Sequence, residues 1–210
     1  MKEVYRTIKN TARAEIIEKR SRFIATAKPV ETEEEAIELI NKLRQKYWDA
    51  THNVYAYIIE KNNIMRYSDD GEPSGTAGMP VLDILKKECL TNLVVVVTRY
   101  FGGILLGTGG LVHAYSKSAK EGVLAAKPIE MALCKETRMK CEYTMLGKIQ
   151  SELRARDLIC GEPIYSDSVE IPVYIPVSEF EKVKADFIDL TNAAISFTDG
   201  GTEYRERRLD

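Results

Sequence analysis

No stretch of this sequence is apolar over the roughly 18–20 residues that a membrane-spanning helix needs. The uninterrupted apolar run Leu93–Val97 is only five residues long. The first ten residues, MKEVYRTIKN, contain no apolar segment typical of a secretory signal. We therefore expect a cytoplasmic protein that has no membrane partner.

Histidine and cysteine are scarce and scattered. The only two histidines are His52 and His113, which excludes a multi-histidine metal site within one chain. The four cysteines form no C-x-x-C pair, so reduced thiols are expected rather than a disulfide framework or a zinc site. No Ser or Cys nucleophile has an identifiable base. We expect no catalytic residue, no bound metal and no cofactor.

The standard nucleotide-binding motifs are also missing. No glycine loop is followed directly by Lys-Ser or Lys-Thr, as a P-loop requires. The closest approach to G-x-G-x-x-G begins at Gly107 and ends in Val112. A standard NTPase or dinucleotide enzyme is thereby disfavoured.

The composition is that of an ordinary globular protein, with 44% hydrophobic and 30% charged residues. Its net charge of −2 is unevenly distributed. Residues 1–135 carry 20 Lys+Arg against 17 Asp+Glu, and residues 136–210 carry 10 against 15. If the protein meets a polyanion, the first part is the better candidate surface.

The first part alternates strand and helix patterns. Apolar segments in residues 3–30 predict two or three strands around the basic turn Lys19–Arg22. That turn is either a solvated hairpin edge or a patch that faces phosphate. Thr32 and Glu35 form a capping box for a helix over residues 33–46. The pattern then predicts these further elements: strands at 52–59, 64–67 and 129–133, a buried central strand at 93–97, a helix with Pro80 at its first position, and a helix to about Leu124.

Beyond Cys134 the pattern has the order β-α-β-β-α-β, which is that of a ferredoxin-like unit. It predicts strands at 135–143, 159–165, 169–177 and 193–198, with helices capped by Thr144 and by a Ser178–Glu181 box. Pro172 and Pro176 favour an edge position for the third strand, because proline cannot donate to a ladder. The chain is thus predicted to be α+β, with domains at 1–134 and 135–210 and a boundary near residues 133–137.

Eight of the 13 glycines lie between Gly71 and Gly110, in two loops. Such clustering indicates either tight packed turns or loops whose backbone closely approaches a ligand. The second loop follows the central strand and opens a helix, a location that suits an anion. Thr108 could cap that helix or bind an oxygen.

Arg99 ends the central strand and has two interpretations. It either contacts an anionic ligand or pairs with Asp69, Asp70 or Glu72 and joins the two loops. The three carboxylates could instead hold Mg²⁺, or satisfy local backbone donors in their own turn. The rings of Tyr100 and Phe101 either stack on unpaired bases or pack locally.

At these residues the sequence resembles the IMPACT family, including its bacterial two-domain (YigZ-like) members. The resemblance covers nearly the whole chain and is carried by four segments: 19–24, 48–52, 69–78 and 99–112. It implies a ribosomal-protein-S5 domain 2-like first domain and a ferredoxin-like second domain, similar to the last two domains of elongation factor G. The family's eukaryotic members act in translational control.

The resemblance and the loop pattern together favour a non-enzymatic, translation-associated regulator that binds RNA, the ribosome or a protein partner in translational control. The expected anion-binding or nucleic-acid-binding residues are Arg99, Tyr100, Gly102, Gly103, Gly107, Thr108, Gly109, Gly110, His113 and Lys117. The expected residues of the partner loop are Asp69, Asp70, Gly71, Glu72, Ser74, Gly75 and Thr76. The alternative is a phosphate-binding or nucleotide-binding small-molecule enzyme of the S5 domain 2-like superfamily.

Overall fold

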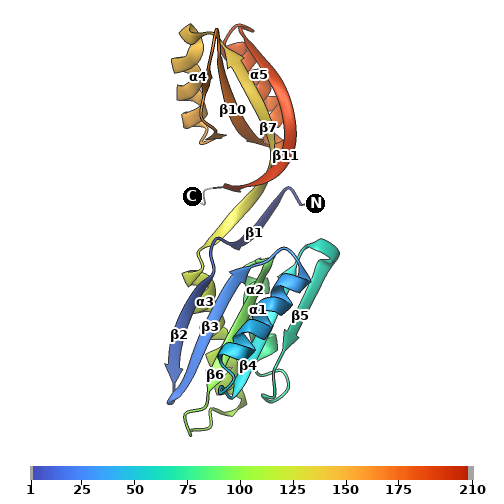
Figure 1. Ribbon diagram of the computed structural model, residues 1–210, viewed down its shortest axis with the longest axis vertical. Helices are drawn as coiled ribbons and strands as arrows, with labels where there is room; N and C mark the ends of the chain where they lie inside the picture. The colour runs from blue at the N-terminus through green and yellow to red at the C-terminus, as the bar shows by residue number, and fades with distance from the viewer. Residues whose placement is uncertain (1, 208–210) are drawn as a thin grey trace. The chain divides into compact units, whose positions relative to one another are not determined.

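The computed structural model describes residues 2–207 and divides them into two compact units (Figure 1). The first unit is Tyr5–Glu130, and the second combines residues 2–4 with residues 131–207. The division passes through two strands, β1 (Val4–Ile8) and β7 (Pro128–Cys141). The expected domain boundary between residues 134 and 135 falls inside β7 and stays a prediction.

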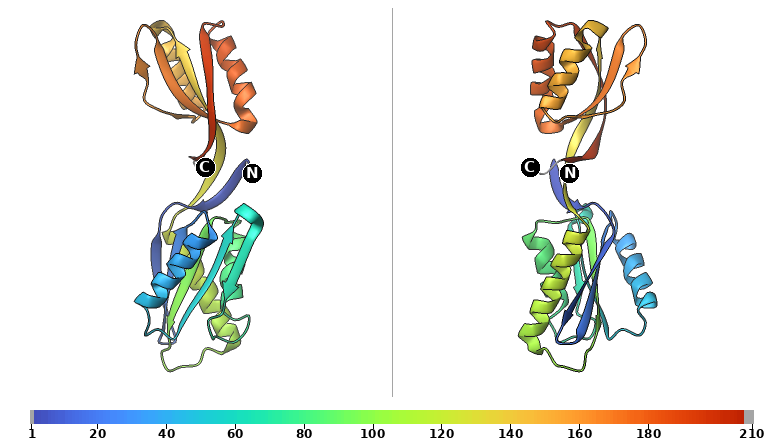
Figure 2. Two further views of the ribbon diagram at one scale, coloured as in Figure 1. Left: turned by 45° about the vertical axis from the view of Figure 1, so that its right-hand side comes forward. Right: turned by 90° about the vertical axis from the view of Figure 1, so that its left-hand side faces the viewer.

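The first unit is built on a five-stranded antiparallel sheet in the order β2-β3-β6-β4-β5. Its strands are β2 (Ala12–Glu18), β3 (Ser21–Pro29), β4 (His52–Ile59), β5 (Ile64–Ser68) and β6 (Leu93–Tyr100). Helix α1 (Glu33–Lys46) covers one face, and α2 (Gly78–Lys87) and α3 (Gly107–Ala125) cover the other (Figure 2). The short 3₁₀ turn η1 (Lys61–Asn63) joins β4 to β5.

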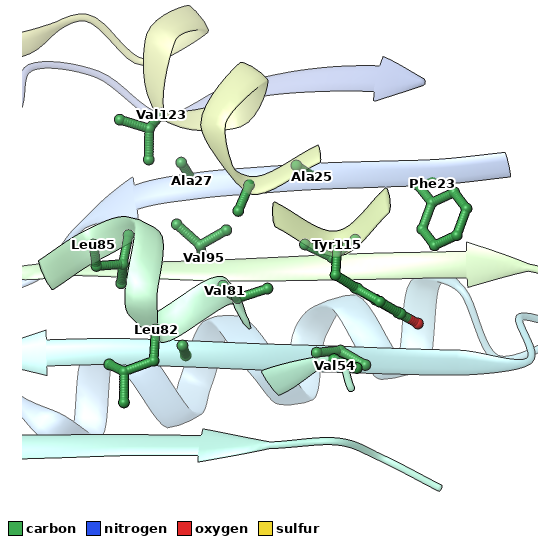
Figure 3. Close-up of a cluster of buried hydrophobic side chains, with 14 of the residues drawn as sticks. Phe23, Ala25, Ala27, Val54, Val81, Leu82, Leu85, Val95, Tyr115 and Val123 are labelled. Atoms are coloured by element: carbon green, nitrogen blue, oxygen red, sulfur yellow. The ribbon is translucent and has the colours of Figure 1, made fainter. Parts of the chain in front are cut away.

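β6 is the central strand, as its unbroken apolar run predicts. Leu93, Val95 and Val97 pack into the core beneath α2 and α3, and Val94 and Val96 pack beneath α1. Figure 3 shows the first of these cores, where side chains of β3, β4 and β6 meet those of α2 and α3. Because successive side chains alternate between faces, Arg99 lies on the α2–α3 side.

The helix starts only partly follow expectation. The amide of Glu35 donates to Thr32 Oγ1 and the Glu35 carboxylate accepts from the Glu31 amide, which confirms the start of α1. Pro80 is the third residue of α2 rather than the first. Thr108 does not cap α3, because that helix begins at Gly107 and its N-cap Leu106 has no side-chain acceptor.

Gly122 lets α3 lie close against β3. A Cβ built at Gly122 would stand 2.7 Å from the Cβ of Ala25. We expect Gly122→Ala to lower the unfolding free energy by about 1 kcal/mol, because overpacking outweighs the gain in helix propensity. Gly109→Ala in the same helix meets no atom within 4 Å and should stabilise slightly. Thermal melting of the two variants checks this, and equal shifts would contradict the close contact.

The second unit has the ferredoxin-like order expected. Strand β7 lies between β11 (Ile195–Arg207) and β10 (Val169–Pro176), and β10 also pairs with the two-residue strands β8 (Ile159–Cys160) and β9 (Ile164–Tyr165). Helices α4 (Tyr143–Ala155) and α5 (Phe180–Leu190) bury their apolar faces on this sheet, and η2 (Val177–Glu179) precedes α5.

Several details of this unit differ from the sequence prediction. The strand predicted at 159–165 is divided into β8 and β9. The two strands predicted at 129–133 and 135–143 are one continuous strand, β7, and the last strand extends to Arg207. Neither Thr144 nor Ser178 caps a helix: α4 begins at Tyr143, and the 3₁₀ turn η2 occupies the position of the expected Ser178 box.

Strand β10 is also not a free edge, contrary to its prolines. Pro172 lies between the residues of β10 that pair with β9 (Val169 and Glu170) and those that pair with β8 (Val173 and Tyr174). Pro172 itself is paired with neither short strand, so its missing N–H is not needed on that side of β10. Within residues 2–207, no helix has both the length and the apolar character required to cross a membrane.

Candidate functional site

Four connecting segments of the first unit meet at one end of its sheet. They are the β2–β3 turn (Lys19 and Arg20), residues 47–51, residues 69–77 and residues 101–106, and together we call them the loop end. The strand register brings them together, because Arg99 lies opposite both Phe23 and His52, and β5 ends at Ser68 beside Tyr55. The loop end is the lower end of this unit in Figure 1. Both glycine loops are therefore neighbours in space.

Side chains and one glycine tie the segments to one another. Thr51 Oγ1 accepts a hydrogen bond from the Phe101 amide at 3.1 Å, and Ser21 Oγ accepts from the Gly102 amide at 3.2 Å. A Cβ at Gly102 would lie 2.1 Å from the carbonyl carbon of Arg20, so only glycine fits there. The loop after β6 is consequently held against the β2–β3 turn.

A buried polar cluster underlies the loop end. Arg99, which is 5% exposed, forms an ion pair with Glu72, which is 8% exposed. The Tyr115 hydroxyl donates to the same Glu72 oxygen at 2.8 Å, and His52 Nε2 lies 3.7 Å from it. The structure thus joins the two glycine loops through Arg99 and Glu72, one of the two interpretations from the sequence.

The surroundings of Arg99 explain why it is a structural cation. Its guanidinium carbon lies 5.3 Å from the ring centre of Phe23 and 5.6 Å from that of Phe101. Its remaining terminal nitrogen donates to Ser21 Oγ at 3.3 Å. A guanidinium covered by two rings and neutralised by a buried carboxylate presents almost no charge to solvent.

Tyr115 reaches Glu72 from α3. Burial raises the pKa of the Tyr115 hydroxyl far above its ordinary value, and the Glu72 carboxylate raises it further. The phenol is therefore a permanent hydrogen-bond donor at physiological pH rather than a titrating acid or base. Its ring meets Phe23 edge-on, with ring centres 5.2 Å apart.

The acidic residues of the first glycine loop have separate partners. Asp69 accepts from the amides of Gly75, Ala77 and Gly78, and so satisfies the first turn of α2. Asp70 accepts from the Asn53 amide at 2.6 Å and from Arg44 at 2.8 Å. Among residues 2–207 no three metal-type side chains gather into a candidate metal site. Asp69 thus satisfies local backbone donors, which is one of the interpretations from the sequence.

The other residues expected in the first loop are held by the same turn. Thr76 Oγ1 donates to the Pro73 carbonyl, whereas Ser74 is exposed. Gly71 lies beside His52, whose Nδ1 is 2.8 Å from the Asp70 carbonyl. Because that carbonyl only accepts, Nδ1 carries the proton in this contact.

The second glycine loop and the start of α3 are exposed. Gly103 and Gly107 adopt left-handed backbone angles (φ 82° and 71°), which explains glycine at both positions. The expected contact residues along α3 are open to solvent: Thr108, Gly109, His113 and Lys117 are exposed, and Gly110 is half-buried. Leu105, at the tip of the loop, is 83% exposed.

The expected site residues left out two features of the loop end, although the sequence had already predicted a basic turn at Lys19–Arg22. Register pairs Glu18 with Ser21, so Lys19 and Arg20 form a two-residue hairpin turn, and both have positive φ (42° and 68°). Trp48 is 82% exposed. No periodic pattern marks either feature, although Lys-Arg between two strands is unusual where Asn-Gly is preferred.

Comparisons with known proteins agree with this architecture. Residues 19–123 match the family described as Impact N-terminal domain, and residues 139–194 match a domain of unknown function, DUF1949. A solved crystal structure described as that of a hypothetical protein superimposes with a TM-score of 0.60 at 28% identity, covering 96% of this chain and 99% of that one.

Two bacterial relatives cover most of the chain, and a vertebrate relative covers about half of it. The IMPACT family member YvyE of Bacillus subtilis is 42% identical, over 98% of this chain and 95% of its own length. YigZ of Escherichia coli is 34% identical, over 80% of this chain and 86% of its own. Protein IMPACT of Danio rerio is 39% identical, over 47% of this chain and 32% of its own. This chain belongs to the IMPACT family.

Proposed function

We propose that this protein is a cytoplasmic, translation-associated regulator that acts by binding RNA, and that the loop end is its RNA-binding surface. One observation carries the proposal: two cations, Lys19 and Arg20, occupy the left-handed positions of the β2–β3 turn. Each non-glycine residue in this conformation costs roughly 1 kcal/mol. A turn optimised for stability alone would have Asn-Gly there.

The position of Lys19 and Arg20 supports a functional reason for keeping cations in these unfavourable left-handed backbone angles. Both are exposed, and within the described part of the chain neither has an ion-pair partner. The backbone of Arg20 abuts Gly102, so the turn that carries both cations adjoins the glycine loop after β6. Exposed cations on a fixed turn suit phosphate groups, since the backbone that carries them needs no ordering on binding.

Other residues of the proposed surface have distinct roles. Tyr100, Thr108, His113 and Lys117 are solvent-accessible and would contact the polyanion. The exposed glycines Gly103, Gly107 and Gly109, with the half-buried Gly110, would allow its close approach. Arg99 and Glu72 would position the loops instead of touching the ligand, because both are buried against each other. The surface lies in the part of the chain with excess positive charge.

The test uses the variant Lys19→Asn/Arg20→Gly, which removes both charges and supplies the preferred turn residues. We expect the variant to be thermally more stable than wild type and to bind labelled poly(U) more weakly. The slope of log affinity against log salt concentration should also become shallower by about two units. Fluorescence anisotropy at several salt concentrations measures the binding. The control Lys86→Gln/Lys87→Gln removes two charges from the far end of α2 and should leave the slope unchanged.

Two results would contradict the proposal. One is wild-type protein that binds no poly(U) at low salt. The other is a turn variant whose affinity and salt slope equal those of wild type. Heat released on mixing with Mg²⁺–ATP would favour the small-molecule enzyme instead.

A further inference from the structure

We propose that Trp48 is a stacking platform for an unpaired base of single-stranded RNA. This inference rests on the proposed function and names the form of RNA that the loop end recognises. It starts from the exposure of Trp48, which at 82% is unusual for an indole within an ordered turn.

The turn that carries Trp48 is fixed on both sides. The Tyr47 amide donates to the Leu43 carbonyl at the end of α1, and the Ala50 amide donates to the Tyr47 carbonyl. Asp49 accepts a hydrogen bond from the Tyr100 hydroxyl at 2.8 Å, and the Thr51 amide donates to the Arg99 carbonyl at 2.9 Å. The backbone around Trp48 is thus anchored to α1 and to β6, although its ring is left in solvent.

Cations and further rings lie next to this turn. The Arg22 guanidinium carbon lies 5.8 Å from the ring centre of Tyr100, and Glu15 holds Arg22 in place through two hydrogen bonds of 2.8 and 2.9 Å. Lys46 Nζ lies 5.2 Å from the ring centre of Tyr47. Trp48 is thus an exposed ring with two half-buried rings and two cations beside its turn. Single-strand binding sites combine rings that stack on bases with cations that meet phosphates.

This arrangement favours RNA over a protein partner. Exposed tryptophan also marks protein interfaces, but those place it within an apolar, charge-depleted centre. Here the neighbours of Trp48 in its own turn are the polar Tyr47 and the charged Asp49, and the exposed apolar side chains at the same end (Phe101, Ile104 and Leu105) belong to a different segment, the loop after β6. Lys19 and Arg20, which form no ion pair within residues 2–207, also lie at this end. A duplex would not satisfy the site, because its base faces are already stacked.

The chain offers a direct probe, since Trp48 is its only tryptophan. We expect single-stranded poly(U) to quench its fluorescence with a titration midpoint equal to that seen by anisotropy, and a poly(A)·poly(U) duplex to leave it unquenched. Trp48→Leu should weaken poly(U) binding roughly tenfold, and Trp48→Phe should weaken it less because a ring remains. Leu124→Ala removes an exposed apolar side chain near the last turn of α3, at the opposite end of that helix from the loop end, and should have little effect.

The outcomes separate this inference from the proposed function. Salt-dependent poly(U) binding without quenching, and with full affinity in Trp48→Leu, would overturn the stacking platform and leave the loop end as an RNA-binding surface. Equal quenching by the duplex would overturn the single-strand preference. Absence of any poly(U) binding by the wild-type protein would overturn both.

Discussion

Arg99→Met is expected to destabilise the first unit by about 3–5 kcal/mol, because it leaves the Glu72 carboxylate buried without its cation. Methionine keeps much of the apolar stem between the Phe23 and Phe101 rings, so the loss reports mainly on the charge. Hydrogen exchange of the β6 amides at Val94–Val97 measures this unit specifically, since these residues form its centre.

Two further variants make the result specific to the buried pair. Adding Glu72→Gln to Arg99→Met should recover part of the loss, because a neutral amide can still accept from Tyr115 without a buried charge. Arg22→Met breaks the exposed pair with Glu15 and should leave stability nearly unchanged, since solvent screens that interaction. If Arg22→Met and Arg99→Met cost the same, burial does not govern the Arg99–Glu72 pair.

Gly102→Ala is the second substitution with a large expected effect. The added Cβ would lie 2.1 Å from the carbonyl carbon of Arg20 and 2.2 Å from its oxygen. Both are backbone atoms, so the β2–β3 turn and the loop after β6 must separate by about 1 Å to reach an ordinary contact. We expect a loss of about 3 kcal/mol in unfolding free energy, seen as a lower melting temperature.

The backbone angle of Gly102 does not complicate this test, because it is not among the positive-φ glycines. Gly109→Ala is the matched control for stability, since its Cβ would meet no atom within 4 Å. The separation should also weaken poly(U) binding, as Lys19 and Arg20 would shift relative to the loop. A Gly102→Ala protein as stable as wild type would show that the turn and the loop are not in contact.

Local patterns predicted the elements around the site well. The helical spacing of apolar side chains located α1 and α3, and an unbroken apolar run located β6, because each of these patterns is a property of one segment alone. Glycine clustering located both loops for a similar reason, since left-handed angles at Gly103 and Gly107 are a local backbone requirement. The order β-α-β-β-α-β identified the ferredoxin-like unit.

The misplaced helix starts have a different cause. Ser178 has the residue type of a cap, yet the chain enters α5 through the 3₁₀ turn η2, whose geometry depends on how β10 ends. β10 is paired on both sides despite its prolines, because β8 and β9 avoid Pro172. The residue types limit which helix caps and strand pairings are possible, and tertiary packing decides which of them form.

By itself, the sequence determined the two α+β units, the family and the two glycine loops at strand ends, all of which follow from short-range periodicity or from contiguous motifs. Only the tertiary structure decided which charges are buried and which face solvent. Arg99 meets Glu72 across 27 residues of sequence and Tyr115 reaches it across 43, so no local pattern could assign these contacts. Pairing with Glu72 buries Arg99, the cation that the sequence analysis placed among the ligand-binding residues. Lys19, Arg20 and Trp48 are instead exposed at the loop end.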